Sequence, residues 1–316
     1  MAKIAQALLR RLGGMVIVLA LVVTVVFIIV RVTPGDPAAV MLGADATPQD
    51  IAQLRAKMGL DAPLLVQYVQ FVLGLLKGDL GQSIFLNQPV TQALAARAEP
   101  TFFLTLFSIL IATAIALPVG IISAVKRGTL FDQIVVVLTM VAASVPSFWL
   151  GLMLIQILAV GQGWFPASGY GGPDTGFLER LHHLILPAIT LGIVNSAMIT
   201  RFTRAAMLDV LGDDYVRTAR AKGASERRVI LKHGLKNALI PIITVIGLSV
   251  AMLVAGAVVT ETVFGLPGVG NLVVSAVLRR DYPVIQGALL VVAAIYVLIN
   301  FVVDMLYIVV DPRVRP

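Results

Sequence analysis

A basic stretch near the middle of the chain carries the residue types that a docking helix needs. It reads Asp214-Tyr215-Val216-Arg217-Thr218-Ala219-Arg220-Ala221-Lys222-Gly223. At helical spacing Tyr215, Thr218, Ala219 and Lys222 share one face, and its small central residues permit a partner to approach closely. Arg217 and Arg220 add positive charge, which suits either an acidic groove on a partner protein or lipid headgroups.

The residues around this stretch define where its helix begins and ends. Gly212 is a natural end for a preceding helix, and Asp213 or Asp214 favours the positive N-terminal end of a new one. Gly223 is typical of a left-handed C-terminal cap, and Ser225 of the start of the next helix. We therefore expect a short helix over Tyr215–Lys222, within a loop that covers residues 201–236.

Polar side chains inside the apolar stretches are candidates for a substrate path, because an unpaired polar group in hydrocarbon is costly. Hydrogen bonds between helices are their alternative role. Pro146 predicts a kink beside Ser144 and Ser147. The candidates are Ser144, Ser147, Gln156, Asn195, Thr244, Ser249 and Asn300.

The loop over residues 261–281 joins a Pro-Gly turn to an apolar stretch that is too short to span a membrane. We expect a short helix there, which either covers a pathway as a gate or serves as an interfacial connector. The gate candidates are Glu261, Phe264, Pro267 and Gly268.

The sequence predicts neither a metal site nor a catalytic site. It has no cysteine, which excludes thiolate ligands and cysteine nucleophiles. His182 and His183 lack a third ligand in their vicinity and are interpreted as interface residues. No Gly-Lys dipeptide occurs, so a Walker-type phosphate-binding loop is absent.

The composition places these segments in a membrane protein. The 316 residues are 59% apolar and 13% charged, whereas soluble domains have about 45–50% and about 25%. We predict an all-α integral membrane protein with one domain over residues 1–316 and six transmembrane helices, the third confined to about 133–160 by later glycines and prolines. The charge-free stretches are Leu12–Val30, Pro100–Val125, Gln133–Pro173, Leu181–Thr200, Asn237–Thr260 and Tyr282–Val303.

The basic residues predict the orientation of these spans. Of the 24 Lys and Arg residues, 16 lie in the segments that share a side with both termini, which predicts that both termini are cytoplasmic. Segment 32–99 is then extracytoplasmic, with one helix capped by Thr47 or Asp50 that reaches Met58, and a second over Leu64–Leu76. The net charge of +7 reflects topology and attraction to anionic lipid, not nucleic-acid binding.

Several ordered motifs resemble the dipeptide, oligopeptide, nickel and glutathione branch of ABC importer permeases, and most of all the dipeptide-permease B type. The general importer pattern is Glu-Ala-Ala followed by three residues and Gly. This chain matches it only at Ala219 and Gly223. Because Arg217 stands where the pattern has glutamate, a contact made by that glutamate is not carried over to this chain. The resemblance covers nearly the whole chain. Besides the basic stretch, it rests on His233, Asn237, Ala238 and Pro241; Pro34-Gly35-Asp36-Pro37; Lys77-Gly78-Asp79-Leu80-Gly81; Leu186-Pro187-Ala188; Glu261-Thr262-Val263-Phe264 with Pro267-Gly268; and Arg280-Asp281-Tyr282-Pro283.

The resemblance implies a type I ABC importer permease fold and a non-catalytic subunit of the cytoplasmic (inner) membrane that translocates di- or oligopeptides. Glutathione and nickel are alternative cargoes. The implied partners are a second homologous permease, two ABC ATPase subunits that hold ATP and Mg, and an extracytoplasmic solute-binding protein. The basic stretch would be the ATPase-coupling site.

Two other classes of protein compete with this interpretation. A secondary transporter driven by an ion gradient would favour buried carboxylates and inverted repeats. Asp304 is the only candidate carboxylate within a predicted span, and no internal repeat is evident. A non-transporting membrane scaffold would explain the spans but not the glycine-bracketed loop.

Overall fold

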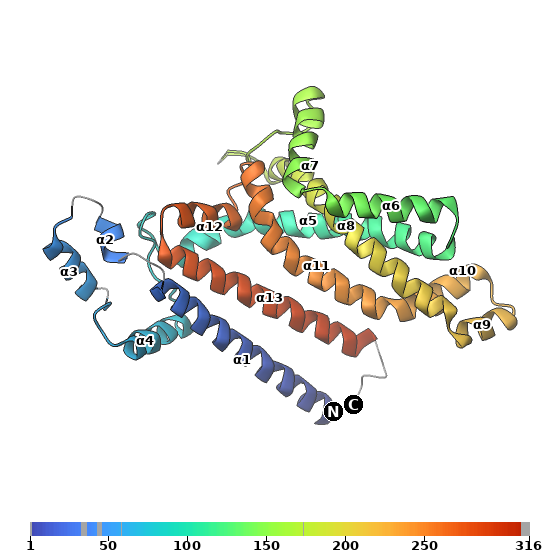
Figure 1. The fold of residues 1–316 in the computed structure, drawn as a ribbon, viewed down its shortest axis with the longest axis horizontal. Helices are drawn as coiled ribbons and strands as arrows, with labels where there is room; N and C mark the ends of the chain where they lie inside the picture. Colours follow the sequence, from blue (N-terminus) through green and yellow to red (C-terminus); the bar gives the residue numbers. More distant parts are fainter. Residues whose placement is uncertain (1, 33–36, 43–45, 58, 173, 311–316) are drawn as a thin grey trace. The chain divides into compact units, whose positions relative to one another are not determined.

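The computed structural model describes residues 2–32, 37–42, 46–57, 59–172 and 174–310, and helices dominate them (Figure 1). Residues 1–99 and 268–297 form one compact unit, and residues 100–267 and 298–316 form another. The prediction of a single domain over 1–316 stays a prediction. Pro34, Gly35 and Asp36 lie outside the described residues.

The first unit contains the N-terminal helices and a short helix near the C-terminal end. Thr47 and Asp50 cap α3 reciprocally: the Asp50 N–H donates to Thr47 Oγ1 at 3.2 Å, and the Thr47 N–H donates to Asp50 Oδ2 at 3.2 Å. The prediction for α4 agrees with its observed bounds, whereas Met58 lies outside the described residues. The elements are α1 (Ala2–Val32), α2 (Pro37–Leu42), α3 (Pro48–Lys57), α4 (Leu64–Leu76), α12 (Val269–Leu278), and the first parts of α5 (Val90–Val125) and α13 (Tyr282–Val310).

The core of this unit joins α5, α12 and α13 through Val90, Leu272 and Val284. The predicted short helix after the Pro-Gly turn is confirmed as α12. Asp281 directly precedes α13 and is buried, and it holds the loop before α5. Its carboxylate accepts hydrogen bonds from Ser83 Oγ at 2.5 Å and from the Phe85 N–H at 3.1 Å.

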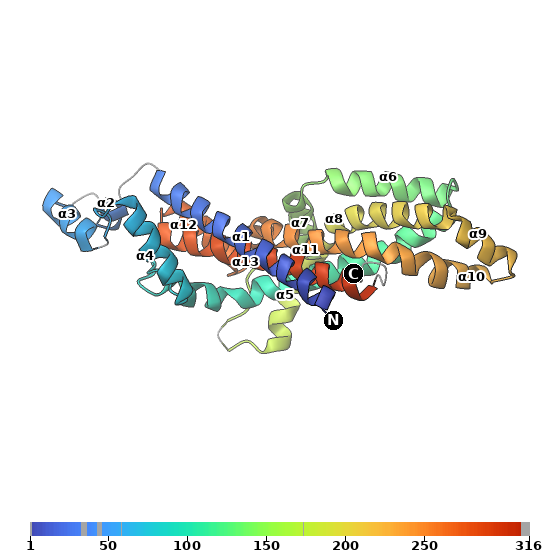
Figure 2. The same ribbon diagram turned by 90° about the horizontal axis from the view of Figure 1, so that it is seen from below.

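The second unit is built around α8 and α11, which lie side by side in both views (Figures 1 and 2). Leu104 from α5, Leu186 from α8 and Leu253 from α11 are buried in one cluster. Its helices are the rest of α5 and α13, α6 (Leu130–Ser144), α7 (Ser147–Leu154), the π-helical segment η1 (Ile155–Gly161), α8 (Phe177–Gly212), α9 (Asp214–Ala221), α10 (Glu226–Arg228), the π-helical segment η2 (Val229–Leu235) and α11 (Lys236–Val263).

In the described part of the chain, five helices are long and apolar enough to cross a membrane, and a sixth span results if α6 and α7–η1 are counted together. These two segments meet at Val145 and Pro146 with a bend of 97°. The kink predicted at Pro146 is therefore confirmed, but it is much sharper than a proline kink in a continuous helix, because Val145 leaves the helical conformation altogether. The six predicted spans correspond to these elements.

Close packing of α5 on α8 leads to a stability prediction. A Cβ at Gly120 would lie 2.8 Å from Thr203 Cβ and 2.9 Å from the Thr200 carbonyl oxygen. We expect Gly120→Ala to lower the free energy of unfolding by about 1–3 kcal/mol, because the backbone of α8 has to move. Gly256→Ala in α11 is the control, since nothing lies within 4 Å of its added Cβ. Denaturant unfolding in micelles measures both; equal stability of the two variants would contradict the packing.

Candidate coupling site

The predicted docking helix is α9, which lies at one end of the paired helices α8 and α11 (Figure 2). It spans Asp214–Ala221, so it begins and ends one residue earlier than predicted. α8 stops at Gly212 as expected, and Gly223 has a φ of +79°, which confirms the left-handed cap. Asp213 occupies the N-cap position, but its side chain makes no capping hydrogen bond.

Two contacts fix α9 to the rest of the second unit. The side chain of Val216 is fully buried, which makes it the apolar anchor of the helix. Tyr215 Oη donates to the His233 carbonyl oxygen at 3.0 Å and accepts from Asn237 Nδ2 at 2.6 Å. His233 lies in η2, and π-helical turns shift backbone hydrogen bonds to other partners. The motif residues His233 and Asn237 therefore help to position α9.

The exposed part of α9 carries charges that are partly paired within the chain. Arg217 and Asp214 are 79% and 93% exposed, and Arg217 Nη1 lies 3.4 Å from Asp214 Oδ1. Arg220 Nε donates to Glu226 Oε1 of α10 at 2.9 Å. Surface pairs of this kind contribute about 0–1 kcal/mol, so a partner can displace them at little cost.

Of the predicted face, Thr218 and Lys222 are exposed and Ala219 is half-buried. Tyr215 is 40% exposed, although its hydroxyl bonds to η2. Asp214, Arg217, Arg220 and Ala221 are exposed beside them. The surface open to a partner therefore includes most of the predicted face, whereas the sequence did not indicate that Val216 is the buried anchor.

A buried ion pair fastens α6 to α8 close to the same end of the unit. Asp132 is 4% exposed, and its two carboxylate oxygens accept from Arg204 Nε at 2.6 Å and Arg204 Nη2 at 2.8 Å. Ser123 Oγ at 2.5 Å and the Gly128 N–H at 2.9 Å complete the site. The end of α5, the following turn, α6 and α8 are thereby held at one carboxylate. The pair was not predicted, because the two residues lie in separate connections between the predicted spans.

Most of the predicted path residues hydrogen-bond within their own helices. The side chains of Ser144, Asn195, Thr244 and Ser249 each donate to the carbonyl four residues earlier, at 2.8–3.0 Å. Such bonds satisfy a hydroxyl or amide in an apolar environment without a partner helix. Gln156 is exposed, whereas Ser147 and Asn300 are half-buried, and the structure does not bring the whole set together at one site.

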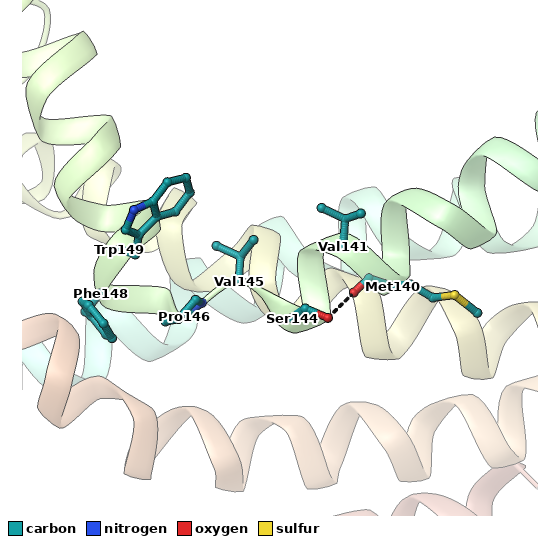
Figure 3. Close-up of a pocket in the computed structure, with 7 residues that line it drawn as sticks. All are labelled: Met140, Val141, Ser144, Val145, Pro146, Phe148 and Trp149. Carbon is teal, nitrogen blue, oxygen red and sulfur yellow. Dashed lines mark hydrogen bonds between the residues drawn. The ribbon is translucent and has the colours of Figure 1, made fainter.

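Ser144 and Pro146 do share a groove of about 530 Å³ at the α6–α7 bend (Figure 3). Its other lining residues are Met140, Val141, Val145, Phe148 and Trp149, so the groove is almost entirely apolar. Phe148 and Trp149 are 47% and 49% exposed. The groove therefore suits apolar side chains or lipid more than an ionic ligand.

The predicted gate residues lie at the C-terminal end of α11. Glu261 is fully buried, and Thr101 Oγ1 donates to its Oε1 at 2.6 Å. Phe264 is 1% exposed and lies 3.1 Å from the position of a Cβ on Gly151. Pro267 is exposed, and Gly268 is the N-cap of α12. Glu261 and Asp132 are thus both buried carboxylates, so Asp304 is not the only candidate for the buried carboxylate that a secondary transporter would favour. The side chain of Asp304 lies outside the described structure.

The described residues contain no group of three or more His, Cys, Asp or Glu side chains that could hold a metal ion. His183 Nδ1 is 3.0 Å from the Gly169 carbonyl oxygen, and the ring of His182 packs on Phe165 at a centroid distance of 5.6 Å. Both histidines thus contact residues of the loop before α8.

Comparisons with known proteins agree along nearly the whole chain. Residues 116–316 match the family described as the binding-protein-dependent transport system inner membrane component, and residues 4–105 match its N-terminal region. The dipeptide transport system permease protein DppB of Escherichia coli K12 is 42% identical, over 98% of both chains. The glutathione transport system permease protein GsiC of Pectobacterium atrosepticum is 45% identical, over 97% of this chain and 98% of that protein.

Among solved structures, a chain of the inward-facing MetNI methionine ABC transporter is similar with a TM-score of 0.57 and 21% identity. The similarity covers 70% of this chain and 97% of that one. At this identity the likeness shows the fold alone: an all-helical membrane permease.

Proposed function

Because the chain belongs to the binding-protein-dependent transport system inner membrane components, we propose that it is the permease subunit through which an ABC importer moves di- or oligopeptides into the cell. It is a non-catalytic, multi-pass protein of the inner membrane. The observation that carries the proposal is the 42% identity to a dipeptide permease over 98% of both chains. Both termini are proposed to be cytoplasmic, as the distribution of basic residues predicts.

The proposed assembly contains a second homologous permease, two ATPase subunits with bound ATP and Mg, and an extracytoplasmic solute-binding protein. In this assembly α9 is the surface on which an ATPase subunit docks. Arg217 and Thr218 support the assignment because they are exposed on a helix whose other side is anchored by Val216. Closure of the ATPase subunits would move α9 as a rigid body together with α8 and η2, and so shift the spans between inward-facing and outward-facing states.

Uptake by the reconstituted importer tests the function. We expect a labelled dipeptide to accumulate in proteoliposomes only when the binding protein and ATP are present, and to do so after ionophores have collapsed the ion gradients. A secondary transporter would show the reverse pattern, with uptake lost on collapse of the gradients and unaffected by removal of ATP.

Glutathione is a second candidate cargo, favoured by the 45% identity to a glutathione permease. It is a tripeptide with a γ-glutamyl linkage and a free thiol, so the two proposals differ in both the length and the chemistry of the substrate. Competition of unlabelled glutathione against the labelled dipeptide distinguishes them, because the preferred cargo displaces the other at the lower concentration. Nickel uptake is the remaining alternative, and the same liposomes measure it directly.

A further inference from the structure

A second cavity lies entirely within the first unit and takes no part in the coupling site. Its volume is about 230 Å³, and it is lined by the end of α1, by α4, by the loop that follows α4 and by the start of α13. Four polar or charged side chains contribute to it: Arg31, Gln70, Asp79 and Gln286. The aromatic residues Phe71 and Tyr282 supply part of its apolar wall.

Gln286 indicates that the cavity is suited to a ligand. The residue is 9% exposed, and its buried side-chain nitrogen has no hydrogen-bond partner in the described part of the chain. A buried donor without a partner costs about 1–3 kcal/mol, and buried polar groups in native proteins are nearly always satisfied. The rest of the Gln286 side chain lines the cavity, so a turn of its terminal amide would expose this nitrogen to the cavity, where an acceptor group of a ligand would satisfy it.

Arg31 adds a positive charge that no acidic side chain neutralises among the residues that the structure describes. Its Nε donates to Gln67 Oε1 at 2.9 Å, and its guanidinium lies 4.9 Å from the centroid of the Phe27 ring. Gln67 is itself fixed, because its Nε2 donates to the carbonyl oxygens of Leu60 and Ala62 at 2.9 and 2.8 Å. None of these partners is an acid, and Arg31 forms no ion pair with any residue in the described part of the chain. Its charge is therefore available to an anion.

Asp79 supplies the opposite charge on the same cavity. Asp79 is exposed and lies in the loop that follows α4. Its Oδ1 accepts from the Gly81 N–H at 2.8 Å, and this hydrogen bond fixes the carboxylate within the loop. No ion pair of Asp79 occurs among the residues that the structure describes. The cavity thus has a cationic, donor-rich part at Arg31 and Gln286 and an exposed acidic residue at its rim.

We infer that this cavity binds a compact zwitterion, with its anionic group at Arg31 and Gln286 and its ammonium group at Asp79. A volume of 230 Å³ corresponds to about eight water molecules at roughly 30 Å³ each, which matches a dipeptide backbone or a phosphatidylethanolamine headgroup. Both sources offer the same chemistry. Only the dipeptide source rests on the proposed function, since a lipid would occupy the cavity whatever the cargo.

Binding to the purified permease complex in dodecyl maltoside, without ATP and without the solute-binding protein, tests the inference. The two probes are labelled glycylglycine and dihexanoyl phosphatidylethanolamine, and dihexanoyl phosphatidylglycerol, which lacks an ammonium, is the comparison lipid. We expect one zwitterion to bind, and Gln286→Glu and Arg31→Gln to weaken it at least tenfold. Asp79→Asn, at an exposed position that does not disturb packing, should weaken the zwitterion but not the comparison lipid.

The matched controls are Gln53→Glu and Arg55→Gln on α3, which lie outside the cavity and should leave binding unchanged. Glycylglycine binding that follows this pattern identifies a peptide source, and phosphatidylethanolamine binding a lipid source. The inference is overturned if neither zwitterion binds the unmodified complex, or if the cavity variants bind as well as the controls. Because the assay contains no ATP, a failure of coupling or transport would leave its result unchanged.

Discussion

Arg204→Leu is expected to lower the free energy of unfolding by about 3 kcal/mol, one of the largest effects of any single substitution outside the apolar core. The substitution leaves the Asp132 carboxylate buried without its cation, and removing one partner of a buried ion pair costs about 3–5 kcal/mol. The lower end applies because the Arg204 side chain retains 24% exposure. Thermal or denaturant unfolding of the purified chain in micelles measures the loss.

A double-mutant cycle separates the ion pair from simple loss of packing. Asp132→Asn in the Arg204→Leu background should recover part of the lost stability, because the amide is neutral, its oxygen can still accept from the Gly128 N–H, and its NH2 can donate to Ser123 Oγ. Arg201→Leu on an exposed part of the same helix is the control and should change stability by less than about 0.5 kcal/mol. If the double variant is less stable than Arg204→Leu alone, the charge pairing is not the cause.

Arg217→Glu and Thr218→Trp are each expected to reduce ATP-driven uptake by about tenfold or more while leaving the fold intact. Both residues are exposed, so the substitutions alter the surface offered to the ATPase rather than the packing of α9. A few residues near the centre of an interface carry most of its binding energy, and truncating one of them costs about 2 kcal/mol or more. Uptake and ATP hydrolysis are measured in the same proteoliposomes, and the expected signature is hydrolysis that no longer depends on substrate-loaded binding protein.

Lys77→Glu is the matched charge reversal, at an exposed residue at the end of α4, and it should leave uptake unchanged. Ala219→Trp is a less clean probe than the sequence suggests, because Ala219 is half-buried and added bulk would disturb α9 itself. Normal uptake by both Arg217→Glu and Thr218→Trp would remove α9 from the coupling pathway.

The family and the helical framework could be predicted from the sequence because the signals are local. The motif resemblance is confirmed by the comparisons, and the bounds of α4 and the ends of α8 and α9 follow from hydrophobic periodicity and from Gly212 and Gly223. The bend at Pro146 could be anticipated, but its angle of 97° could not. Proline removes a hydrogen bond, whereas the packing of α6 and α7 decides where the chain then goes.

Contacts between distant residues were beyond the sequence. Asp132 and Arg204 are 72 positions apart, and Thr101 and Glu261 are 160 apart, so no spacing rule links them. The buried anchor of α9 was also not predicted, because a short helix with small and charged residues on all sides gives no clear apolar stripe. Only the structure reveals that Val216 faces inward and Tyr215 faces η2.

The central claim, that α9 docks on a separate ATPase, is tested most directly by cross-linking. The chain has no cysteine, so Thr218→Cys introduces a unique thiol that can carry a benzophenone maleimide. Thr262→Cys, on the exposed surface at the other end of α11, is the matched control. The account predicts that light links position 218, and not position 262, to the ATPase subunit in the assembled importer. Cross-links to the ATPase from position 262 with none from position 218 would contradict it.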